Sequence, residues 1–339
     1  MKADIKIKPQ KEYNISLLRF MAMVFIVLCH FFQYYDLELA WWFNVGVQIF
    51  FCVSGFLYGK KRITSPIEFI CKNMKKILIP YFCFLIPSII LYYLFHREAI
   101  TVLIIKRALL TRGVINGLGH LWFISYILFC YLITPYLQSL ADKMKKLKWQ
   151  AFLGIFVLFA IFGSVLSKEF GSVFVFSRIF CYLFGYFGAV FLQNYKNHIF
   201  KFLICVFSFI TLIMNIIRIY LKYINPQTSE LIDLFVEYSH AFLGISITFI
   251  FILFIKNIRR CAFLDLADKY SFYIYICHQL FILSPFTLLT ITDYRIFNWT
   301  ITIFSIVVLA IILKFVADVV EGIFMNIVKH IKRKICSSR

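Results

Sequence analysis

The stretch LLRFMAMVFIVLCHF, residues 17–31, carries one arginine and one histidine in an otherwise almost wholly apolar run. Arg19 and His30 are eleven residues apart, so at 100° per residue they lie about 20° apart around a helix, on one face. The rise between them is about 16 Å, half the thickness of the hydrocarbon core of a bilayer. Both residues therefore need an explanation if this helix crosses a membrane.

The composition of the chain is that of a membrane protein. Hydrophobic residues make up 62% of the 339 residues and charged residues only 15%, against about 45–50% and about 25% in soluble globular proteins. A net charge of +20 would point to nucleic acid in a soluble chain, but here the basic residues gather in loops between apolar runs, and we expect no nucleic-acid partner. The ten cysteines lie in apolar runs or basic loops, which implies no disulfide framework.

Ten segments are apolar and long enough to cross a bilayer, which takes about 20 residues. The basic N-terminus, 1–13, precedes an apolar run without a small-residue cleavage site, which predicts an uncleaved first span. We therefore expect an all-α integral membrane protein with a single transmembrane domain over 1–339. The predicted spans lie at about 14–35, 42–60, 76–95, 119–140, 150–167, 173–193, 199–221, 235–256, 270–291 and 298–322.

The basic residues sort strongly to one side of the predicted membrane. Of the 36 lysines and arginines, 25 fall in alternate loops on one side, seven on the other side and four within spans. Loops rich in lysine and arginine stay in the cytoplasm. Both termini, including the C-terminal tail 323–339, are therefore predicted to be cytoplasmic.

One outer connection, 96–118, is unusually basic and contains AITVLIIKRALL, which is too short to span. A helix at about 98–112 that lies in the interface, with its basic side chains toward the headgroups, fits this pattern. The alternative is a role in holding an anionic, lipid-linked acceptor.

Ionisable side chains within the predicted spans mark candidate functional positions, because a charge at a helix centre in the bilayer costs about 2.5–3.5 kcal/mol. Arg19 could instead extend to the membrane surface, and His30 could be a buried histidine bonded to a carbonyl. Together they favour a polar channel from the cytoplasmic side. The other such residues are Arg178, Arg218, His278, Lys314, Asp318 and Glu321, with His120 and His240 near the outer ends of their spans.

Lys72, Lys75 and Lys76 cluster just before the third span. They fit an ordinary cytoplasmic loop, or a site that binds a polyphosphate. In the second span, Ser54 and Gly55 allow another helix to approach closely.

In order and spacing, these motifs resemble the membrane acyltransferase family 3, bacterial O-acyltransferases with ten helices, and the likeness covers nearly the whole chain. The resemblance rests on the Arg19–His30 spacing and on the segments FFCVSGFL (50–57), KKILIPY (75–81), HLWFISYILFCYLITP (120–135), YSFYIYICHQLF (270–281) and VEGIF (320–324).

The resemblance implies a multi-pass protein of the bacterial inner membrane that transfers an acyl group, usually acetyl, from cytoplasmic acyl-CoA to a hydroxyl of a surface or lipid-linked saccharide. Acyl-CoA is then a co-substrate, and we expect no permanently bound cofactor and no metal. His30 would act as a general base or as an acylated nucleophile. Glu321 would pair with Arg19 and orient it. The donor would be bound by Arg19, Ser54, Lys72, Lys75 and Lys76, and the acceptor by His120, Trp122, Arg178, Arg218, His240 and His278.

The chain departs from the family pattern at three places. Gln48 stands where many members have an acidic residue, and lysines stand where the basic motif often has arginines, which weakens bidentate phosphate contact. The segment around Glu321 lacks the family's lysine and proline.

A transporter or flippase for a lipid-linked glycan would also place arginines and histidines in a membrane channel. Many transporters show paired halves with matching broken helices, and the sequence shows no such halves. A regulatory or structural membrane protein leaves the buried ionisable residues unexplained.

Overall fold

The computed structural model describes residues 12–96, 117–144, 154, 157–165, 175–194, 197–226, 229–255 and 258–337. The regular structure in these ranges is helical. The elements are α1 (Tyr13–Tyr34), α2 (Leu39–Phe43), α3 (Gly46–Gly59), α4 (Pro66–His96), the 3₁₀ turn η1 (Gly119–Leu121), α6 (Trp122–Met144), α8 (Phe176–Asn194), α9 (Asn197–Tyr223), α10 (Glu230–Phe254), α11 (Ala262–Ile282) and α12 (Arg295–Ser337). A further helical segment covers 157–165.

Eight stretches in the described part of the chain are long and apolar enough to cross a membrane. They correspond to the first four, the sixth to eighth and the tenth predicted spans. Large apolar side chains stay exposed along α9 and α12, for example Phe209, Ile216, Phe304 and Phe315, as expected for helices that face lipid rather than water. The protein is therefore a multi-pass membrane protein.

Several predicted boundaries change. The ninth span, predicted at 270–291, is α11, which begins eight residues earlier and ends nine earlier. The lysine cluster before the third span lies on α4 rather than in a loop, because α4 begins at Pro66. The C-terminal tail continues α12 as helix to Ser337. Only part of the fifth predicted span is described, and the predicted interfacial helix at about 98–112 lies outside the described residues.

Helices α1 and α11 pack side by side and run in the same direction. Arg19 contacts Asp268 near one end of the pair, and His30 contacts Gln279 near the other. Each pair is 249 residues apart in the sequence, so the two helices keep one register over three turns. Asp268 and Gln279 on α11 are therefore separated by eleven residues, as Arg19 and His30 are on α1.

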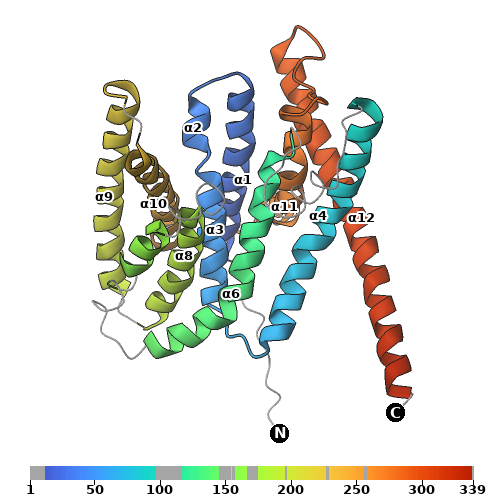
Figure 1. Ribbon diagram of the computed structural model, residues 1–339, viewed down its shortest axis with the longest axis horizontal. Coiled ribbons are helices and arrows are strands. Elements are labelled where there is room, and N and C mark those ends of the chain that lie inside the picture. Colours follow the sequence, from blue (N-terminus) through green and yellow to red (C-terminus); the bar gives the residue numbers. More distant parts are fainter. Residues whose placement is uncertain are drawn as a thin grey trace.

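The bundle has a lower end in Figure 1, where α1 begins and α12 ends. Helix α1 lies near its middle, with α8, α9 and α10 on one side and α4, α11 and α12 on the other. Helices α3 and α8 pack at very short range, because a Cβ atom on Gly55 would lie 2.0 Å from the carbonyl oxygen of Tyr182. This confirms the close approach predicted at Ser54 and Gly55.

Candidate active site

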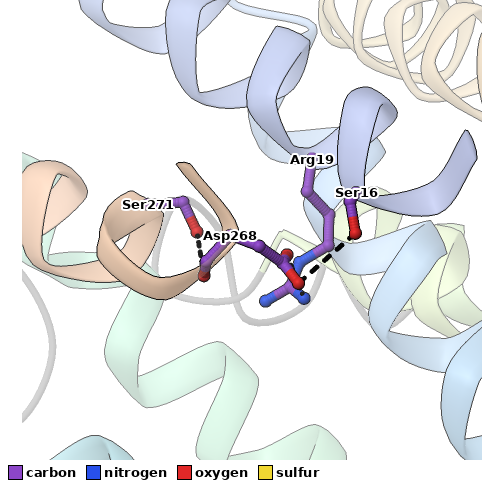
Figure 2. A network of polar contacts seen from close by, with 4 residues as sticks. All are labelled: Ser16, Arg19, Asp268 and Ser271. Atoms are coloured by element: carbon purple, nitrogen blue, oxygen red, sulfur yellow. Dashed lines mark hydrogen bonds and ion pairs between the residues drawn. The ribbon is translucent and has the colours of Figure 1, made fainter. Parts of the chain in front are cut away.

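At the lower end of the α1–α11 pair, an arginine of α1 meets a carboxylate of α11 (Figure 2). Nη1 of Arg19 lies 2.7 Å from Oδ1 of Asp268, and the hydroxyl of Ser16 donates to Oδ2 of the same carboxylate at 3.4 Å. The hydroxyl of Ser271 donates to the backbone oxygen of Asp268 at 3.3 Å. The sequence had suggested that Arg19 pairs with Glu321. In the structure Arg19 pairs with Asp268 instead. Its partner comes from the residues that were predicted to be a loop.

A cavity of about 550 Å³ opens beside this ion pair, between α1, α3, α4, α6, α11 and α12. It brings together four of the predicted residues, Arg19, Ser54, Lys76 and Glu321. Other charged residues lining it are Asp265, Asp268, Lys269, Lys314 and Asp318. Since Arg19 and Lys314 are paired with Asp268 and Asp318, Lys76 and Lys269 are the cavity cations that form no ion pair within the described part of the chain.

The other two predicted lysines lie away from this cavity. Lys75 turns toward α12, where its Nζ lies 3.5 Å from the sulfur of Met325 and 5.9 Å from the ring centre of Phe324. Lys72 is exposed at the surface of α4 and does not line the cavity. The three lysines therefore divide, and Lys76 alone of them faces the cavity.

Toward the upper end of the same helix pair, three histidines from three elements lie together. The ring of His278 on α11 is 5.0 Å from the ring of His30 on α1 and 4.7 Å from the ring of His120 on η1. His278 is fully buried and His120 is 4% exposed. Three of the predicted site residues thus form one cluster, which we call the histidine cluster.

The hydrogen bonds of two of these rings define their tautomers. Nε2 of His120 lies 2.9 Å from the backbone oxygen of Ile276, and Nδ1 of His278 lies 2.6 Å from that of Tyr275. A carbonyl oxygen only accepts, so these nitrogens carry the hydrogen. The lone pairs then sit on Nδ1 of His120 and Nε2 of His278, two buried atoms without a hydrogen-bond partner in the described part of the chain. Both can accept a hydrogen bond from a hydroxyl group.

Tyr275 joins the cavity to the histidine cluster. It lines the cavity, its hydroxyl donates to the backbone oxygen of His120, and its ring lies 5.4 Å from the ring of His120 and 5.7 Å from that of His278. Phe123 packs against Tyr275 at 5.0 Å and lines the same part of the cavity. The charged cavity therefore ends at an aromatic pair that borders the histidines.

The remaining predicted acceptor residues form two separate groups. Next to His120, the guanidinium of Arg178 stacks on the ring of Trp122 at 3.7 Å and lies 5.2 Å from that of Tyr126. Trp122 follows His120 by two residues, so this group begins directly after the histidine cluster along the chain.

Arg218 lies on α9, away from the histidine cluster, and is only 1% exposed where α9 faces α2. It lies 3.4 Å from the ring of Trp41 and is hydrogen-bonded to Asn215. Asn215 also donates to the backbone oxygen of Ser239, the neighbour of His240 on α10. No hydrogen bond, ion pair or ring contact between described residues joins Arg218 or His240 to the histidine cluster.

Sequence reasoning missed Asp268, Gln279 and Gln33. Gln33 lies one turn after His30 on α1, with its Oε1 2.9 Å from Nδ1 of the histidine. A signal for the first two was present, because Asp268 and Gln279 repeat the eleven-residue spacing of Arg19 and His30.

The fold and the site define a membrane-embedded protein whose interior holds charged and histidine side chains on one helix pair, as an enzyme of the bilayer would. A model of the acyltransferase family 3 domain matches residues 12–319. The chain therefore belongs to this family, the one its motifs resemble, and it is an acyltransferase. No match was found among curated proteins or solved structures. The family assignment favours an acyltransferase over a glycan transporter.

Proposed function

We propose that this protein transfers an acyl group, with acetyl as the first candidate, from cytoplasmic acyl-CoA to a hydroxyl of a cell-surface or lipid-linked saccharide, such as O-antigen, capsule or exopolysaccharide. The observation that carries the proposal is that the charged cavity and the histidine cluster are adjacent. The two regions share helices α1 and α11 and meet at Tyr275.

The lower end of the bundle is the cytoplasmic end in this proposal. The lysines of α4 and the basic end of α12 gather there, as the positive-inside rule requires. Lys76, Lys269 and Arg19 would then bind the phosphates of coenzyme A at the cavity. The pantetheine arm would reach past Phe123 and Tyr275 toward His30.

At the histidine cluster, His30 acts as the general base. It takes the proton of the acceptor hydroxyl, whose oxygen attacks the thioester carbonyl carbon. The new carbon–oxygen bond forms, the carbon–sulfur bond breaks, and the thiolate of coenzyme A leaves and takes up the proton. The lone pairs of His120 and His278 accept hydrogen bonds from other hydroxyls of the saccharide, beside the stacked Trp122 and Arg178. Arg218 and His240 lie in another part of the bundle, and we do not assign them to the acceptor.

The test uses the full-length protein in lipid nanodiscs with labelled acetyl-CoA and a panel of p-nitrophenyl glycosides as acceptors. His30→Ala should lower the rate of label transfer by about 10²–10⁴-fold. The matched control is His198→Ala, which removes an exposed histidine at the start of α9 and should leave the rate unchanged.

Transfer that survives His30→Ala would overturn the role of His30. Labelled acetyl groups that accumulate on His30 when no acceptor is added would show that it is a nucleophile rather than a base. A wild-type protein that neither binds acetyl-CoA nor releases its thiol would overturn the proposed donor.

A further inference from the structure

Gln279 is a buried carboxamide on α11 that contacts the other two residues of the histidine cluster, His120 and His30. It follows His278 on α11 and is 5% exposed. Its Oε1 lies 3.2 Å from the backbone nitrogen of His120. Its Nε2 lies 3.0 Å from Nε2 of His30 and 3.3 Å from Nδ1 of the same ring.

The backbone of His120 decides which way this carboxamide faces. A backbone N–H only donates, so the atom of Gln279 opposite it is the carbonyl oxygen. The NH₂ group of Gln279 therefore points at His30. Any rotation of the amide by half a turn would leave the N–H of His120 facing another donor.

Two contacts together favour one tautomer of His30. The NH₂ group of Gln279 is closer to Nε2 than to Nδ1, and an NH₂ group donates to a lone pair, so the tautomer with Nε2 unprotonated satisfies it. The neutral ring then carries its hydrogen on Nδ1, which donates to Oε1 of Gln33 at 2.9 Å. The same arrangement, in which a third group holds one nitrogen of a histidine so that the other is free to act, is typical of activated histidine bases.

The acceptor hydroxyl must bond to the same lone pair before His30 can take its proton. It therefore displaces the NH₂ group of Gln279 from Nε2, while the bond from the His120 backbone still holds the other end of the carboxamide. The displaced N–H groups then lie beside the hydroxyl oxygen that attacks the thioester. At that place the carbonyl oxygen of the acyl group becomes negatively charged as the new carbon–oxygen bond forms.

We propose that the NH₂ group of Gln279 is the oxyanion donor of the transfer reaction, aimed by the backbone N–H of His120. The inference rests on the proposed function. In the tetrahedral intermediate Gln279 donates to the oxyanion, and the donation ends when the carbonyl re-forms and the carbon–sulfur bond breaks. No electron or proton is gained or lost by Gln279 itself.

The test is Gln279→Met, which keeps the length of the side chain and removes the donor. Loss of one side-chain oxyanion donor typically lowers kcat by about 10²–10³-fold. We expect this loss in kcat with the KM for acetyl-CoA unchanged, because the donor acts in the transition state and not on the bound ground state. The assay is label transfer from acetyl-CoA to the glycoside acceptor in nanodiscs.

The chain offers a matched glutamine as control. The side chain of Gln138 on α6 bonds the backbone of Ile63, with the N–H of Ile63 donating to its Oε1 at 2.6 Å and its Nε2 donating to the carbonyl oxygen at 3.1 Å. Gln138→Met removes a carboxamide that ties two segments together, and it should lower the melting temperature without lowering kcat.

A Gln279→Met protein that keeps wild-type kcat would overturn the inference and leave the proposed function standing. A loss of kcat that is matched by the Gln138 variant, or that follows a loss of folded protein in size-exclusion chromatography, would show a structural role and overturn it as well. A wild-type protein without transfer from acetyl-CoA would overturn both the proposed function and the inference.

Discussion

The ion pair between Arg19 and Asp268 makes a prediction that separates this structure from the pairing suggested by the sequence. Arg19→Gln and Asp268→Asn each remove one charge and keep similar size, and the asparagine still offers an oxygen to the hydroxyl of Ser16. Each single variant should lower kcat/KM for acetyl-CoA, because it leaves the other charge without its partner in the membrane. The double variant should lose far less than the product of the two single effects.

The size of the coupling follows from the geometry. Two unit charges about 4 Å apart attract by about 4 kcal/mol at an effective dielectric constant of about 20. The side chain of Arg19 is 31% exposed and that of Asp268 is 16% exposed, so partial contact with solvent screens the pair. We expect a coupling energy of about 2 kcal/mol, which is about 30-fold in kcat/KM.

The assay is a double-mutant cycle on label transfer from acetyl-CoA in nanodiscs. A second cycle with Arg19→Gln and Glu321→Gln is the control, since Glu321 lines the cavity but does not contact Arg19. Its effects should add to within about 0.5 kcal/mol. A coupling of that small size for Asp268, or a larger one for Glu321, would refute the reasoning.

Two further predictions concern packing and the donor cavity. Gly55→Ala should destabilise the protein by about 1–3 kcal/mol, because its Cβ would overlap the backbone of Tyr182. The melting temperature should fall accordingly. The control Gly322→Ala, with nothing within 4 Å of the new atom, should leave the melting temperature unchanged. Equal melting temperatures would contradict the close α3–α8 contact. Lys76→Ala should raise the KM for acetyl-CoA about 10-fold by removing a charged contact of about 1.5 kcal/mol. Lys72→Ala, outside the cavity, should leave KM unchanged. Equal effects of the two variants would contradict the assignment of Lys76 alone to the donor cavity.

Hydropathy predicted most spans but misplaced α11, for a physical reason. Asp265, Asp268 and Lys269 lower the apolar character of its first turns, so the first turns read as a loop. In the folded protein Asp268 is paired with Arg19, and the pairing offsets the cost of placing its charge between α1 and α11. A scale that scores each residue alone has no term for a partner so far away in the sequence.

The candidate site was partly predictable for the same reason. Helical periodicity placed Arg19 and His30 on one face, and α1 carries both toward α11. Depth in the membrane grouped Arg218 and His240 with the other outer histidines, but depth says nothing of the position around the bundle. The structure separates these two by placing them with α2, α9 and α10.

The shared register of α1 and α11 has a consequence for biogenesis. When α1 enters the bilayer, the carboxylate that will pair with Arg19 has not been synthesised, because Asp268 follows 249 residues later. At a translation rate of about 5–20 residues per second, this interval is about 12–50 s. During that time the first helix carries a charge with no partner, at a cost of up to about 2.5–3.5 kcal/mol. The partner of Arg19 therefore arrives only with α11, after all the helices from α2 to α10 have been made.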